Sequence, residues 1–257
     1  MSNRIPVVAG NWKMNGDEPR ALEIVMRLAA ADPLGSGVVR VVCPPFVHLK
    51  AVANHARGST ILIGAQNCHW EDAGAFTGEV SPAMLAGLVD YVIVGHSERR
   101  AYFNETDETV NKKVHAVLRH GFHPIVCVGE TADEREAGRT AEVIERQLKL
   151  GLEGVELTEG FVIAYEPVWA IGTGVAATPA MANETIGLIR SNVRSLFGAQ
   201  GADAIRILYG GSVSPANFAS IMEQPEIDGG LVGGASLNPD DFNELISIAA
   251  RSVTPAA

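Results

Sequence analysis

The sequence predicts one α/β domain over residues 1–257, a closed (β/α)8 barrel of eight parallel strands ringed by helices. Short apolar segments rich in valine and isoleucine alternate with helical patterns from one end of the chain to the other. Eight such pairs in 257 residues match the usual size of this barrel. No Pro/Gly/Ser linker or low-complexity tract divides the chain, so we expect a single domain.

The eight strand candidates are continuously apolar, which is typical of parallel strands covered on both faces. In chain order they are residues 5–11, 38–43, 60–65, 91–94, 124–128, 161–165, 205–209 and 230–232. A doubly wound sheet is the alternative. It would usually carry a glycine-rich fingerprint after the first strand, where this chain reads NWKMNG at residues 11–16.

Helical patterns fill the intervals between the strands. Val110, Val114 and Val117 recur at helical spacing in one interval, and Ile186 and Ile189 do so in another. Polar residues that can cap a helix precede several of these patterns. These capping candidates are Thr106, Thr131, Thr178 before Pro179, and Ser214 before Pro215.

Composition and net charge restrict the classes of protein and partner that we expect. Hydrophobic residues are 47% and charged residues 19%, enough for a continuous core. The net charge of −10 disfavours nucleic acid and anionic membranes as partners, although it does not exclude a small anionic substrate. No apolar run approaches the ~18 residues of a membrane span, and no signal peptide is evident. We therefore expect a cytoplasmic location.

Cysteines and histidines do not predict a metal site or a disulfide framework. Cys43, Cys68 and Cys127 form no CxxC pair, and an odd count argues against disulfide pairing. Cys43 and Cys127 end apolar strand candidates, where buried thiols are expected. The seven histidines have no carboxylates arranged beside them as ligands.

A carboxylate ends the sixth strand candidate. Glu166 follows the apolar run 161–165, and Pro167 after it disfavours helix and keeps Glu166 extended. The next segment, residues 167–174, is too apolar for an ordinary surface loop and contains Gly172 and Gly174. A carboxylate beneath such a flap suits proton abstraction away from water. For Glu166 alone, a solvated carboxylate before a mobile loop is the more frequent outcome.

Other strand ends carry polar groups that would meet at the mouth of the barrel. Asn11 and Lys13 follow the first strand, and His96 follows the fourth, just before a helical segment at 97–101. We expect the helix N-terminus to lower the pKa of His96 and keep the ring neutral. A surface lysine and a packed structural histidine are the alternatives.

Glycine clusters follow the last two strands, at YGGSV (209–213) and GGAS (233–236). Glycine lets backbone amides approach a bound group closely. The loops after strands seven and eight form the recurrent phosphate site of this fold, so the paired clusters favour phosphate binding over two tight turns.

Five segments together closely resemble the triosephosphate isomerase family. They are NWKMN (11–15), GHSERR (95–100), AYEPVWAIGTG (164–174), YGGSV (209–213) and GGAS (233–236). The resemblance implies a TIM barrel enzyme of glycolysis and gluconeogenesis. It would interconvert dihydroxyacetone phosphate and glyceraldehyde 3-phosphate through an enediolate, without a cofactor.

The resemblance also implies roles for individual residues. Glu166 resembles the catalytic base, His96 the group that donates to the enediolate oxygens, and Lys13 the cation that binds substrate. The remaining substrate-binding residues would be Asn11 and the amides of Gly172, Ser212, Gly233 and Gly234, with Gly172 arriving when the flap closes.

The segment from Gln66 to Pro82 is long for a barrel loop and carries Trp70 and Phe76. An exposed aromatic loop of this length usually docks on another surface. The resemblance implies insertion into a second subunit beside its first loop, which predicts a homodimer with Thr77 at the interface.

One segment departs from the family. Residues 175–177 read Val-Ala-Ala, where the family often has Lys-Thr-Ala at the trailing hinge of the flap. Two other functions stay open: another aldose–ketose isomerase or epimerase on a phosphate-binding barrel, and a catalytically silent phosphate-binding barrel that acts as a sensor or scaffold. Retention of Glu166, His96 and Lys13 together argues against the latter.

Overall fold

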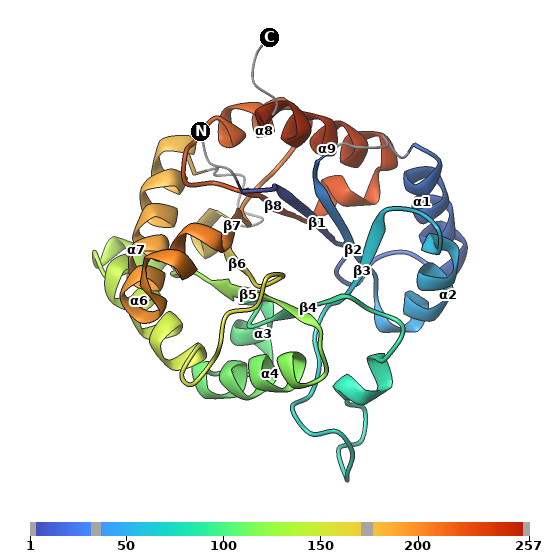
Figure 1. Cartoon of the computed structure of the whole chain (residues 1–257), viewed down its shortest axis with the longest axis horizontal. Coiled ribbons are helices and arrows are strands. Elements are labelled where there is room, and N and C mark those ends of the chain that lie inside the picture. Colours follow the sequence, from blue (N-terminus) through green and yellow to red (C-terminus); the bar gives the residue numbers. More distant parts are fainter. Residues whose placement is uncertain (1–3, 32–36, 171–176, 254–257) are drawn as a thin grey trace.

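A computed structural model describes residues 4–31, 37–170 and 177–253. The strands close into one barrel in chain order, with β1 paired in parallel to both β2 and β8 (Figure 1). Their bounds are β1 Val7–Asn11, β2 Val39–Cys43, β3 Ile61–Ala65, β4 Tyr91–Val94, β5 His123–Val128, β6 Val162–Tyr165, β7 Arg206–Tyr209 and β8 Gly229–Val232. The predicted barrel is confirmed.

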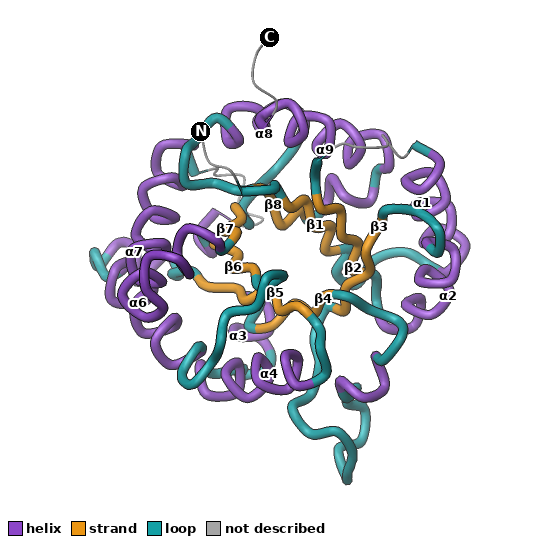
Figure 2. The backbone as a smooth tube through the Cα atoms, viewed as in Figure 1, coloured by secondary structure: helices purple, strands orange, loops and turns teal. Residues whose placement is uncertain are grey.

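Helices surround this ring of strands, as Figure 2 shows. The α-helices are α1 Glu18–Ala30, α2 Phe46–Ala56, α3 Ser97–Tyr102, α4 Asp107–Arg119, α5 Ala132–Glu136, α6 Thr140–Gly151, α7 Pro179–Ala204, α8 Pro215–Met222 and α9 Pro239–Val253. The described residues also include short 3-10 helices: η1 Pro82–Leu85 lies between β3 and β4, η2 Val168–Ala170 between β6 and α7, and η3 Gly234–Leu237 between β8 and α9.

The predicted helix starts are confirmed by their capping bonds. Thr106, Thr131 and Thr178 each accept a hydrogen bond from a backbone N–H in the first turn of the following helix. Ser214 precedes Pro215 at the start of α8. These caps satisfy amides that otherwise lack a partner at a helix start, so they fix where each helix begins.

Alternation along the strands divides the core into two layers. Val7 and Ala9 of β1 belong to a buried cluster made of strand residues alone, which fills the barrel interior. Val8 belongs to a second, larger cluster that includes helix residues such as Ile24 and Leu28. Because successive side chains of a strand point to opposite faces, both faces are buried, as the continuous apolar runs predict.

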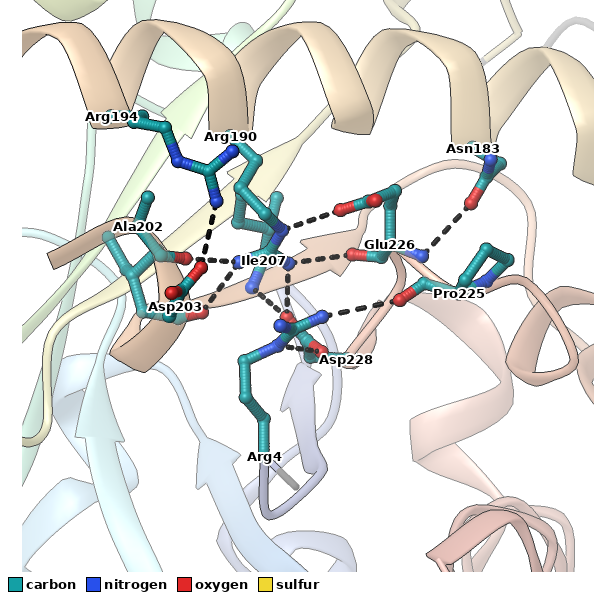
Figure 3. Close-up of polar contacts among 11 residues, drawn as sticks. Arg4, Asn183, Arg190, Arg194, Ala202, Asp203, Ile207, Pro225, Glu226 and Asp228 are labelled. Carbon is teal, nitrogen blue, oxygen red and sulfur yellow. Dashed lines mark hydrogen bonds and ion pairs between the residues drawn. The ribbon is translucent and has the colours of Figure 1, made fainter. Parts of the chain in front are cut away.

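A buried ionic cluster joins α7 to the amino-terminal end of the barrel (Figure 3). Arg190 donates to the carboxylate of Asp228 at 2.7 Å and to that of Glu226 at 2.7 Å. Asp228 also accepts from Arg4 at 2.6 Å and from the N–H of Ile207 at 2.9 Å. Asp228 therefore links three segments that are distant in the sequence.

Removal of the Asp228 carboxylate should strongly destabilise the fold. In Asp228→Ala, the Arg190 guanidinium stays buried without this partner, which we expect to cost ~3–5 kcal/mol and on the order of 10 °C in Tm. Asp203→Ala is the control, because Asp203 pairs with Arg194 at the surface and such pairs contribute about 0–1 kcal/mol. Equal melting temperatures of the two variants would contradict the assignment.

Candidate active site

A cavity of about 580 Å³ opens where the carboxyl ends of the strands meet. The residues that line it follow five different strands, and they include most of the predicted site. These are Asn11, Lys13, His96, Glu166, Ser212, Gly233 and Gly234. The structure thus brings seven predicted residues together from both halves of the chain. Gly172 and most of the hinge at 175–177 lie outside the described residues, so their roles stay predictions.

Glu166 is fixed at the end of β6. Its N–H donates to the carbonyl of Val128 at 2.8 Å, which continues the parallel pairing of β6 with β5. Its carboxylate is 2% exposed and accepts from the N–H of Ser97 at 2.9 Å and from the Ser97 hydroxyl at 3.1 Å. The Nε2 atom of His96 lies 3.0 Å from the same carboxylate.

Burial of Glu166 raises its pKa, but His96 and Ser97 act more strongly in the opposite direction. The charge of His96 and hydrogen bonds from His96 and Ser97 hold the pKa below the ordinary value of 4.5. A carboxylate with a lowered pKa is ionised at neutral pH, as a base that takes a proton must be.

His96 occupies the N-cap position of α3. Its Nδ1 atom accepts from the N–H of Glu98 at 3.2 Å, so in the neutral ring Nε2 carries the hydrogen and donates to Glu166. Burial lowers the pKa of His96, but attraction to Glu166 and a hydrogen bond to it outweigh burial and raise the pKa above 6.5. The expectation of a lowered pKa is therefore wrong, because the effect of the nearby carboxylate of Glu166 decides the direction of the shift.

This pair predicts a pH-dependent contribution to stability. The lowered pKa of Glu166 stabilises the fold above pH 4.5, and this is lost as pH falls through the lowered value. The raised pKa of His96 stabilises the fold below pH 6.5, and this is lost as pH rises through the raised value. We expect the difference in Tm between the wild type and Glu166→Gln to be larger at about pH 5.5 than at about pH 8.5. Thermal melts that give the same difference at both pH values would contradict the coupling.

Lys13 has an unusual backbone conformation, with φ of +53°. Its N–H donates to Oδ1 of Asn11 at 3.0 Å, and its carbonyl accepts from the side chain of Gln66 at 2.9 Å. Its Nζ atom lies 2.7 Å from the carboxylate of Glu98, at the cavity. Residues other than glycine rarely adopt this conformation, and those that do are concentrated at functional sites.

The glycine loops after β7 and β8 contribute backbone to the wall of the cavity. A Cβ atom at Gly211 would overlap the hydroxyl of Tyr209. A Cβ atom at Gly233 would stand 3.7 Å from Cε of Lys13. The amides of this wall therefore lie near the Lys13 side chain, which suits a bound phosphate.

Several residues of the site could not be predicted from the strand ends alone. Ser97 and Glu98 follow His96 directly in the sequence. Their roles become clear only in the structure, where Ser97 donates to Glu166 and Glu98 accepts from Lys13. Glu130 is fully buried and accepts from Nε1 of Trp169 at 2.9 Å, which holds the start of the flap. Trp169 is half-buried, and no sequence pattern pairs it with Glu130.

Within residues 4–31, 37–170 and 177–253, no helix is both long and apolar enough to cross a membrane. Among the same residues, no group of three or more His, Cys, Asp or Glu side chains is placed to hold a metal ion. Cys43 and Cys127 are buried free thiols, as predicted.

Comparison with known proteins gives one consistent result. A family model described as triosephosphate isomerase matches residues 6–249. Triosephosphate isomerase of Acetivibrio thermocellus is 55% identical over 250 residues, covering 95% of this chain and 98% of that protein. The enzyme of Clostridium botulinum is 53% identical over 247 residues, covering 95% and 99%. The enzyme of Lactobacillus delbrueckii subsp. bulgaricus is 49% identical over 248 residues, covering 95% and 98%.

Proposed function

The chain belongs to the triosephosphate isomerase family, and we propose that Glu166 is the base with which it interconverts dihydroxyacetone phosphate and glyceraldehyde 3-phosphate. The protein is an intramolecular aldose–ketose isomerase. One observation supports this role above the others: the ionised, buried carboxylate of Glu166 lies on the wall of the cavity that Lys13 and His96 also line. Glu166 takes the proton from the carbon beside the carbonyl and returns it to the neighbouring carbon.

His96 and Lys13 act on the oxygens of the enediolate. The Nε2–H of His96 donates to these oxygens and moves protons between them, because the N–H of Glu98 occupies Nδ1. The Lys13 ammonium attracts the substrate and offsets the negative charge that develops as the proton leaves. No cofactor is needed for these steps, since each is a proton transfer or an electrostatic contact.

The phosphate is bound by amides of Ser212, Gly233 and Gly234, with Asn11 beside Lys13 and with Gly172 joining when the flap closes. The glycine backbone on the cavity wall supports this placement. Closure matters because an exposed enediolate phosphate can eliminate its phosphate. Binding energy from the phosphate can drive closure and exclude water while the intermediate exists.

An assay with a chelator tests this function. Isomerisation of glyceraldehyde 3-phosphate in metal-free buffer with EDTA should proceed at an unchanged rate. A silent phosphate-binding barrel would instead bind triose phosphates without converting them. Dependence on an added metal would favour an epimerase or isomerase of the metal-dependent kind.

The active form is a homodimer that docks through the loop from Gln66 to Pro82. This loop projects from the barrel between β3 and η1 (Figure 1). The loop exposes Phe76 (43%) and Thr77, and Met14 beside Lys13 is 95% exposed. Such apolar exposure next to catalytic residues supports an interface that covers the first loop of a second copy.

A charge at Thr77 should separate the subunits. Thr77→Arg is expected to shift sedimentation from dimer to monomer and to lower kcat/KM by ~10²-fold, because the Lys13 segment loses its support. Thr158→Arg is the matched control, since Thr158 is exposed in the loop before β6. Full activity of a monomeric Thr77→Arg variant would contradict the proposed dimer.

We assign the protein to the cytoplasm and treat residues 1–257 as one domain. The pairing of β1 with β8, which joins the two ends of the chain in one barrel, supports a single domain. The net charge of −10 supports neither a nucleic acid nor an anionic membrane as a partner.

A further inference from the structure

Gln147 interrupts an otherwise apolar helix face. The buried residues of α6 fall at helical spacing, namely Val143, Ile144, Gln147, Leu148 and Gly151. Gln147 is 5% exposed. A primary amide at such a position destabilises the core unless its oxygen and nitrogen both find hydrogen-bond partners.

Both polar atoms of Gln147 bind the same residue, Gly129, in the loop after β5. Oε1 accepts from the N–H of Gly129 at 2.8 Å, and Nε2 donates to the carbonyl of Gly129 at 3.1 Å. This two-point contact fixes both the position of the Gly129 backbone and its rotation relative to α6.

Gly129 in turn packs directly on the backbone of Glu166. A Cβ atom at Gly129 would overlap the Glu166 carbonyl, so the two main chains are in van der Waals contact. On either side of this contact, the Glu166 N–H donates to Val128 at 2.8 Å and the Val168 N–H donates to Glu130 at 3.2 Å. The loop that Gln147 binds therefore packs against the Glu166 backbone and supports it.

A cavity beside this contact leaves the loop room to move. A second cavity of about 410 Å³ is lined by Gln147, Gly129 and Glu166, together with Leu150 and Val168. The loop has room to relax into this cavity if the Gln147 bonds are lost. The Gln147 side chain thus acts together with the flanking backbone bonds to keep Gly129 against Glu166.

We propose that Gln147 is a positioning residue for the isomerase reaction, which sets the place of the Glu166 carboxylate through Gly129. The inference rests on the proposed role of Glu166 as the base. Gln147 does not line the cavity that Glu166, His96 and Lys13 line. Its loss should therefore lower kcat and leave substrate binding in place, because the phosphate amides and Lys13 lie on other loops.

The test is Gln147→Met, which keeps the length of the side chain and removes both hydrogen bonds. We expect kcat to fall roughly tenfold, part of the ~10²-fold that a displacement of about 1 Å can cause, with KM and inhibition by inorganic phosphate changed less than about twofold. Leu148→Ala is the control, since Leu148 is buried on the same face of α6. Each variant is assayed well below its own Tm.

Gln147→Glu supplies a second readout. Its carboxylate can accept from the Gly129 N–H but can donate to the Gly129 carbonyl only when protonated, and burial raises the pKa of such a carboxyl. We expect its kcat relative to the wild type to rise as pH falls from about 8.5 to about 6. Equal losses of kcat in Gln147→Met and Leu148→Ala, or a flat ratio for Gln147→Glu, would overturn the inference. An active Glu166→Gln variant would instead overturn the base assignment.

Discussion

Glu166→Gln is expected to lower kcat by about 10³- to 10⁴-fold for the isomerisation of glyceraldehyde 3-phosphate, with KM within about twofold. Glutamine keeps the size of the side chain but cannot take a proton. The carboxylate touches His96 and Ser97, and the phosphate site lies on other loops, so binding should survive. Steady-state kinetics in both directions measures this.

A more conservative change at the same position should have a smaller effect. Glu166→Asp keeps the charge but withdraws the carboxylate by about 1 Å, which should cost ~10²-fold in kcat. Circular dichroism of both variants controls for misfolding, because the buried carboxylate also binds Ser97. Unaltered turnover in either variant would remove Glu166 from the mechanism.

Lys13→Met has the second-largest expected effect. The ammonium ends at the cavity, 2.7 Å from Glu98 and close to Gly233. Loss of this charge should lower kcat/KM by about 10²- to 10³-fold, with weaker binding of inorganic phosphate as well. Titration of phosphate as a competitive inhibitor separates the contribution to binding from that to kcat.

The matched control for Lys13 is Lys50→Met, because Lys50 is exposed on α2 away from the cavity. It removes one positive charge without touching the site. If the two variants lose the same activity, Lys13 acts only through the overall charge of the protein, and its assignment to the substrate fails.

The barrel could be predicted because each strand is indicated by its own residues and by those directly after it. Each predicted strand ends at the observed residue, since most of these buried strands are one apolar run with a polar residue or glycine directly after it. The starts are less regular: β1 begins at Val7 rather than at residue 5, and β8 begins at Gly229. Helix starts were equally local, because a capping threonine contacts its own first turn.

The site residues at strand ends could be predicted in the same way, but their contacts with distant parts of the chain could not. Glu166, His96 and Lys13 stand at strand ends, so the topology alone brings them to one cavity. The raised pKa of His96 could not be predicted, because it depends on Glu166, 70 positions later in the chain. Gln147 was equally hidden, since its partner Gly129 lies on a different element.

Deuterium exchange tests the central claim most directly. The wild type and Glu166→Gln are equilibrated with glyceraldehyde 3-phosphate in D2O containing EDTA, and proton NMR follows the carbon-bound hydrogens of substrate and product. Proton transfer through Glu166 predicts that deuterium enters at the carbon beside the carbonyl with the wild type and not with the variant. Entry of deuterium on carbon, or conversion of one triose phosphate into the other, at the wild-type rate in Glu166→Gln would contradict it.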